Sequence, residues 1–179
     1  MAADIRRAFA LLRGPENEWN RIVADPAAPR TLRPTVGVLL AVATLAAALG
    51  YLVLRPVGTP LLFVPIYALL FAAGRLLGVV AARQLLRSRA DISAEKASLL
   101  AGWGSIPILL AGALEILPIP FLRWLWVVGG LGLAYMNLAT AMTPVLGASS
   151  ERSAALSLRA TAALALPIVA FDLLRYVCP

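Results

Sequence analysis

The chain has 179 residues, 61% of them hydrophobic, and its mean hydropathy is +0.85. A soluble domain of this size is nearer half apolar, so the surplus apolar surface is expected to face lipid. The formal net charge of +7 does not indicate nucleic-acid binding, because fifteen of the sixteen cations are arginines and most of them flank apolar spans. These observations predict an all-α fold, a polytopic membrane protein.

Two short amphipathic helices are predicted ahead of the first apolar span. Residues 4–13 and 16–24 each place their apolar side chains on one face, and Gly14-Pro15 separates the two helices. An apolar face beside a tryptophan and several arginines is typical of helices lying in the headgroup layer. The alternative is a soluble tail packed on the bundle. Lipid-surface contacts are expected from Arg6, Arg7, Phe9, Arg13, Trp19 and Arg21.

Five membrane-spanning helices are predicted to follow. They are expected at residues 35–54, 60–86, 97–117, 121–142 and 154–177. Each has about twenty residues or a little more, enough to cross a hydrocarbon core of about 30 Å. The chain is therefore expected to divide into a cytoplasmic or interfacial segment at 1–33 and a transmembrane bundle of five helices at 34–179.

The distribution of cations predicts the orientation. If the N-terminus is cytoplasmic, twelve cations fall inside, three fall outside, and one lies within the membrane. Because cytoplasmic loops carry an excess of Lys and Arg, we expect the N-terminus inside and the C-terminus outside. The basic cytoplasmic face is expected to contact anionic lipid headgroups.

One charge lies inside the second span. Arg75 follows Gly74 in an otherwise apolar stretch, where an arginine is costly unless it finds partners or reaches the headgroups. Ser105, Asn137 and Thr161 are expected at a similar depth on the other helices, and with Arg75 they would form an intramembrane polar site. The alternative is that Arg75 extends to the inner headgroups, and the sequence leaves both interpretations open.

A second group of charges is expected at the outer ends of the helices. Its members are Arg55, Glu115, Arg123, Asp172 and Arg175. Two acids and three cations at one level indicate an ion-pair network that closes this end of the bundle. Paired carboxylates can do acid–base work, but the sequence brings no nucleophile or metal ligand beside them.

Small residues and prolines are expected to shape the bundle. Gly74 and Gly78 form a small-xxx-small pair that lets two helices approach closely. Pro65, Pro107 and Pro167 lie within spans, where each removes a backbone hydrogen bond and leaves a carbonyl free. Trp103, Trp124 and Trp126 lie near helix ends and are typical of interface anchors.

Signatures of catalysis are lacking in the sequence. It contains no phosphate-binding GxxxxGK[ST] loop, no GxSxG turn and no set of metal ligands, and it has no histidine and a single cysteine. We therefore expect a non-enzymatic protein that binds no cofactor or metal.

Several short motifs resemble the bacterial branch of the Yip family, five-span membrane proteins named for interaction with Ypt/Rab GTPases. The matching residues are 7–26, RAFALLRGPENEWNRIVADP, then Trp103-Gly-Ser-Ile-Pro107, Leu117-Pro118, Gly132-Leu-Ala-Tyr135 and Thr143-Pro144-Val145. The resemblance implies a five-helix membrane domain and a role in membrane shaping or traffic. The family's cytosolic Asp-Leu-Tyr-Gly-Pro motif is absent, so GTPase binding does not carry over.

Together these patterns predict a non-enzymatic, Yip-like protein of the bacterial inner membrane that organises the bilayer or partner proteins. Its expected partners are anionic lipids and either a second copy or another membrane protein. The alternative is a small transporter or channel that uses the polar site around Arg75. Five spans cannot divide into two equal inverted repeats, which favours the first interpretation.

Overall fold

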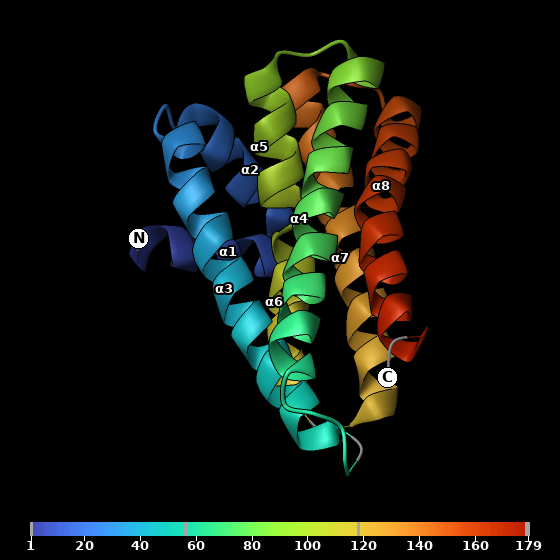
Figure 1. Cartoon of the computed structure of the whole chain (residues 1–179). Coiled ribbons are helices and arrows are strands. Elements are labelled where there is room, and N and C mark those ends of the chain that lie inside the picture. The colour runs from blue at the N-terminus through green and yellow to red at the C-terminus, as the bar shows by residue number, and fades with distance from the viewer. Residues whose placement is uncertain (1, 56, 118, 178–179) are drawn as a thin grey trace.

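The structure, a computed structural model, describes residues 2–55, 57–117 and 119–177, without the side chains of 2, 3, 120, 121, 123 and 175–177. Within these ranges every regular element is helical (Figure 1). The elements are α1 (Ala2–Arg13), α2 (Pro15–Ala24), α3 (Ala28–Leu54), α4 (Phe63–Ala90), α5 (Ala94–Gly104), α6 (Ile106–Ala113), the 3-10 turn η1 (Leu114–Ile116), α7 (Pro120–Leu146) and α8 (Ser150–Val177).

Five stretches of helix are long and apolar enough to cross a membrane, which confirms the predicted all-α, polytopic class. They are Ala28–Leu54, Phe63–Ala90, Ala94–Ile116, Trp124–Leu146 and Ser150–Leu174. A helix satisfies all its backbone hydrogen bonds internally, as the bilayer core requires. The helices extend beyond the predicted spans by a few residues, mostly at one end of the bundle. This end carries Arg33, Arg87, Lys96 and Arg152, and we call it the basic end of the bundle.

The third span lies at the centre of the bundle. Its most apolar window is 72% buried, against 28–39% for the windows of the other four. This span is broken near its middle, because Pro107 has no N–H to bond to the carbonyl of Trp103. As a result α5 ends at Gly104 and α6 begins at Ile106. The predicted effect of Pro107 on its helix is therefore confirmed.

Helices α4 and α8 lie against each other along much of their length (Figure 1). A Cβ atom at Gly78 would lie 2.6 Å from the carbonyl oxygen of Leu164, and one at Gly74 would lie 3.1 Å from Cβ of Phe171. Only glycine permits so close an approach of two helix backbones. The expected role of the Gly74–Gly78 pair is confirmed.

The N-terminal helices pack on the bundle. Ala8 and Leu11 of α1 and Trp19 and Ile22 of α2 are at most 2% exposed and belong to the same hydrophobic core as the spans. In Figure 1, α1 lies across the side of the bundle at about mid-height, and α2 lies between it and the end that holds the turn from α4 to α5. One face of each helix packs on the bundle, and the other face keeps Phe9 and Val23 exposed, so the interfacial arrangement stays a prediction. The two helices share one core with the five spans.

Candidate functional site

A buried ion pair joins α4 to the end of the third span. Nη2 of Arg75 lies 2.7 Å from Oε1 of Glu115, and the two side chains are 1% and 3% exposed. The hydroxyl of Tyr67 donates a hydrogen bond of 3.1 Å to Oε2 of the same carboxylate. The guanidinium of Arg75 also lies 3.2 Å from the ring centroid of Phe71. We call these four residues the ion-pair centre.

Helix geometry directs Arg75 toward Glu115. Side chains on a helix point toward its N-terminus, so Arg75 extends back along α4 past Phe71 and Tyr67. Nη1 of Arg75 reaches the carbonyl oxygen of Phe71 at 3.4 Å. Tyr67 is fixed in turn by stacking on Tyr51 of α3, with 4.6 Å between ring centroids. The ion-pair centre thus connects α3, α4 and η1.

Two glycines allow the chain to close around the ion pair. A Cβ atom at Gly50 of α3 would lie 2.0 Å from the carbonyl oxygen of Glu115. One at Gly112 of α6 would lie 3.0 Å from Cζ of Phe71 and 3.1 Å from Nε of Arg75. The charges are therefore enclosed by packed atoms, which strengthens their attraction and makes the loss of either partner costly.

The predicted polar layer around Arg75 is wrong in its partners. Ser105 is fully buried, but its hydroxyl donates to the carbonyl of Gly102, 2.8 Å away on its own helix. Asn137 bonds to Trp19 and to the carbonyl of Trp103. The hydroxyl of Thr161 makes no hydrogen bond within the part of the chain that the structure describes. The alternative, extension of Arg75 to the inner headgroups, is also wrong, because its side chain is buried against Glu115.

Two members of the predicted outer ion-pair network have partners that the structure shows. Glu115 pairs with Arg75, a cation that was not expected in this network, and Nη1 of Arg55 donates to the carbonyl of Thr59, which closes the turn between α3 and α4. Asp172 is 2% exposed on α8, one helical turn beyond the Ile168 that packs on Gly74. The side chains of Arg123 and Arg175 lie outside the described residues.

A second buried polar group fixes the N-terminal helices. Because residue 107 is proline, the carbonyl of Trp103 accepts a hydrogen bond of 3.0 Å from Nδ2 of Asn137. Oδ1 of Asn137 then accepts one of 2.6 Å from the indole nitrogen of Trp19. Trp19 is fully buried and Asn137 is 2% exposed. We call Trp19, Asn137 and the Trp103 carbonyl the Trp19 anchor, which ties α2 to α5 and α7.

Charged side chains surround the Trp19 anchor at its margin. Nε of Arg7 lies 3.1 Å from Glu18, and Nη1 of Arg7 lies 2.9 Å from Asp25. A hydrogen bond from the backbone N–H of Ala27, and then the Arg7 guanidinium, hold the pKa of Asp25 below its ordinary value. Arg7 also lies 5.9 Å from the ring centroid of the fully buried Trp103, so the prediction of Trp103 as an interface anchor is wrong.

The six predicted lipid contacts divide into two groups. Arg6, Phe9, Arg13 and Arg21 are exposed, as contact with headgroups requires. Trp19 is wrong as a lipid contact, because Asn137 offers its indole N–H a buried acceptor. Arg7 is half-buried, and its guanidinium is taken up by Glu18 and Asp25 rather than by an external anion.

Comparison with known proteins adds no assignment. No family model, curated protein or solved structure matches the chain. Membership of the Yip family therefore stays a prediction that rests on the short motifs alone. Among the described residues, no three His, Cys, Asp or Glu side chains are placed to hold a metal ion.

One sequence signal pointed to the partner of Arg75. Within the five predicted spans the only acids are Glu115 and Asp172, so a buried arginine had two carboxylates available. The pair was not predicted, because Arg75 and Glu115 were assigned to opposite halves of the membrane. The direction of the arginine side chain and the break in the third span bring the two charges to one level.

Proposed function

We propose that the chain is a non-enzymatic integral membrane protein that shapes the bilayer or organises partner proteins within it. The observation that carries the proposal is the attachment of α1 and α2 by the Trp19 anchor, which lies between the basic end and the break near the middle of the third span. Two extra helices beside that half of the bundle make the molecule wider in one leaflet than in the other. A rigid protein that is wider in one leaflet favours bending of the bilayer, with the leaflet that holds its wider part on the convex side.

The exposed surface of α1 and α2 supports this proposal. Phe9 is 51% and Val23 48% exposed, so each helix keeps an apolar side chain free to enter the bilayer. Arg6, Arg13 and Arg21 are exposed on the same two helices and suit anionic headgroups. In this proposal the basic end is cytoplasmic, in accord with the excess of cations there.

The family, the compartment and the partners are part of the proposal. A Yip-like protein of a bacterial inner membrane would have the five long helices and the basic N-terminal segment found here. Its partners would be anionic lipids, a second copy of the chain or another membrane protein. A large lipid-facing surface with many exposed leucines and valines leaves room for such contacts.

A second function, transport through the membrane, is favoured by one observation. Charged residues at membrane depth often mark an ion or substrate pathway, and Arg75 and Glu115 form such a pair. Their burial among Phe71, Tyr67 and Gly112 supports a structural role more strongly, because a pathway needs contact with water.

Reconstitution of the full chain into vesicles tests both proposals in one experiment. Phosphatidylcholine vesicles with one-fifth phosphatidylserine would be prepared at rising protein content and loaded with pH-sensitive and chloride-sensitive dyes. We expect the vesicle diameter to fall as protein content rises, without protein-dependent dye response. Trp19→Ala should weaken the effect on diameter, whereas Leu62→Ala, at an exposed position of the opposite end, should not. A dye response proportional to protein, with unchanged diameter, would favour transport and refute the shaping proposal.

A further inference from the structure

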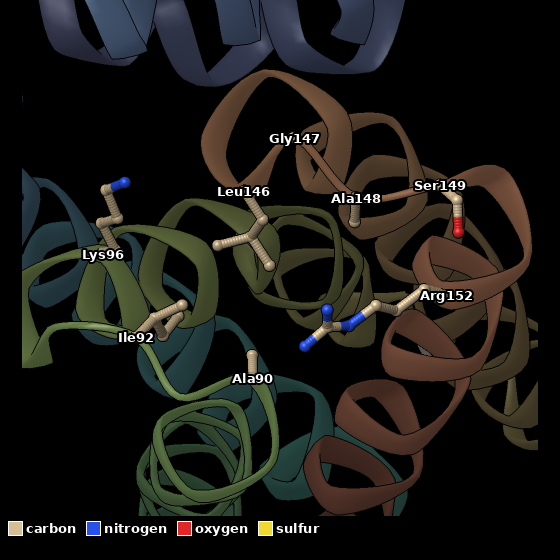
Figure 2. Close-up of a pocket in the computed structure, with 8 residues that line it drawn as sticks. All are labelled: Ala90, Ile92, Lys96, Leu146, Gly147, Ala148, Ser149 and Arg152. Atoms are coloured by element: carbon tan, nitrogen blue, oxygen red, sulfur yellow. The ribbon is translucent and has the colours of Figure 1, made fainter.

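The basic end of the bundle holds a cavity that the proposed function does not use (Figure 2). Its volume is about 240 Å³, and Ile92 and Leu146 supply part of its apolar wall. The residues that line it include two cations, Lys96 and Arg152, and no carboxylate. The cavity is smaller than the ~300–1,000 Å³ typical of sites for drug-sized ligands, so it suits a compact group.

The two cations come from helices that begin in the same way. Helix α5 begins with Ser93-Ala-Glu-Lys96 and helix α8 with Ser149-Ser-Glu-Arg152. The carbonyl of Ser93 accepts the first helical hydrogen bond of α5 at 3.0 Å, and that of Ser149 accepts the first of α8 at 2.8 Å. Each cation is therefore the third residue of its helix.

This position is unfavourable for a cation. The first turn of a helix is the positive end of its dipole, which stabilises acids and disfavours Lys and Arg. Among the residues that the structure describes, neither Lys96 nor Arg152 forms an ion pair or a side-chain hydrogen bond, although a glutamate precedes each. Both side chains are exposed, and both departures from this rule border one cavity. Departures of this kind are expected at functional sites.

One of the two cations reaches into the cavity. Figure 2 shows the guanidinium of Arg152 reaching into the cavity toward Ala90, with Ser149 at the near edge. Lys96 stands on the opposite side, where it is exposed and its ammonium points away from Arg152, so its side chain has to turn to reach the cavity. A guanidinium can bind two oxygens of one phosphate, and the flexible stem of a lysine can bring its charge to a third.

We propose that this cavity binds a phosphate group, held by Arg152 and Lys96. The same chemistry is offered by a soluble phosphate compound and by the phosphomonoester headgroup of phosphatidic acid. The apolar wall near Leu146 could contact the carbon skeleton of a soluble phosphate compound or the glycerol and acyl chains of the lipid. The site is separate from the Trp19 anchor, so the proposal does not depend on the membrane-shaping function.

The test uses the full chain and two probes. In neutral detergent, binding of radiolabelled inorganic phosphate is measured at equilibrium. In parallel, the protein is reconstituted in phosphatidylcholine nanodiscs with one-tenth phosphatidic acid, and the lipid that stays with the protein after extraction is quantified by mass spectrometry. The double variant Lys96→Gln/Arg152→Gln is compared with Arg87→Gln/Arg89→Gln, which removes the same charge from exposed residues of the same end that do not line the cavity.

We expect the cavity variant to lose at least about tenfold in affinity for one probe, as two charge-assisted contacts imply, and the control to lose little. Loss of phosphate binding identifies a soluble compound, and loss of phosphatidic acid enrichment alone identifies a headgroup. Arg152→Lys should retain part of the binding, because it keeps the charge but not the fork of donors. Binding of neither probe, or equal losses in both double variants, would overturn the proposal.

Discussion

The ion-pair centre and the Trp19 anchor both join helices through buried polar side chains, but with different chemistry. The ion-pair centre joins α3, α4 and η1 through a full positive and a full negative charge that water does not reach. The Trp19 anchor joins α2, α5 and α7 through neutral hydrogen bonds, and its charged residues stay at the margin, where Arg7 is about one-fifth exposed.

The difference shows where in a bundle a buried ion pair is useful despite the free-energy cost of desolvating its charges. A buried ion pair contributes little net stability but strongly penalises every arrangement that separates its members. It therefore suits the centre of the bundle, where α4 has to meet the third span in one register. A neutral hydrogen bond has a milder penalty, which suits two peripheral helices that add to an existing bundle.

The largest expected effect comes from removing one member of the ion-pair centre. Arg75→Leu leaves the carboxylate of Glu115 buried without its cation, and should cost about 3–5 kcal/mol in the free energy of unfolding. Unfolding by SDS in mixed micelles, followed by circular dichroism, would measure it. Arg87→Leu, an exposed residue of the same helix, is the control.

Removing both charges should reverse most of this loss. Arg75→Met/Glu115→Leu replaces the pair by apolar side chains of similar volume, a change that is often neutral in buried pairs. If the single and double variants were equally unstable, the ion pair would not be the source of the effect. The contrast between the ion-pair centre and the Trp19 anchor would then be wrong.

The next effect concerns the closeness of α3 to the ion-pair centre. A methyl group at residue 50 would lie 2.0 Å from the carbonyl oxygen of Glu115, a backbone atom that cannot turn aside. We expect Gly50→Ala to destabilise the bundle by about 3 kcal/mol, at the upper end of overpacking. Gly37→Ala on the same helix meets nothing within 4 Å and should be neutral or slightly stabilising. Equal stability of the two variants would contradict this packing.

A smaller and more local effect is expected at the Trp19 anchor. Trp19→Phe keeps most of the buried ring but leaves Oδ1 of Asn137 without a donor, at a cost of about 1–3 kcal/mol. Hydrogen exchange should then speed up in α1 and α2 while α4 and α8 keep their protection. Phe9→Leu, at an exposed position of α1, should leave exchange unchanged. Faster exchange throughout the bundle would show that the anchor is not a peripheral attachment.

The smallest effect is a dependence on pH confined to the margin of the Trp19 anchor. The pKa of Asp25 is lowered by the Ala27 N–H and Arg7, so its contribution is present above the ordinary value of 3.8 and is lost as the pH falls through the lowered value. Cleavage within α2 by pepsin, a protease active in acid, should therefore quicken as the pH falls from about 4 toward about 2, measured against cleavage of an unfolded control peptide at each pH. Asp25→Asn should flatten this dependence, and an unchanged profile in that variant would assign the effect to another group.

Composition and periodicity predicted the helices well and the contacts poorly. Apolar runs of about twenty residues determine spanning helices almost alone, since a bilayer permits few other structures. The partners of Arg75, Ser105 and Asn137 depend on the rotation of each helix, which no single-chain pattern specifies. Trp19 illustrates the limit, because the same amphipathic pattern serves a helix on lipid and a helix on protein. Its buried acceptor, Asn137, lies 118 residues away in the chain.

The separation of Arg75 and Glu115 along the chain has a consequence for biosynthesis. The two residues are 40 positions apart, so at about 5–20 residues per second the ribosome delivers the carboxylate some 2–8 s after the guanidinium. During that interval α4 either enters the bilayer with its arginine still drawn toward water or waits beside the insertion machinery. In the second case, the arrival of α6 and η1 sets the time at which α4 enters the lipid, and the second and third spans are expected to leave the translocon as a pair.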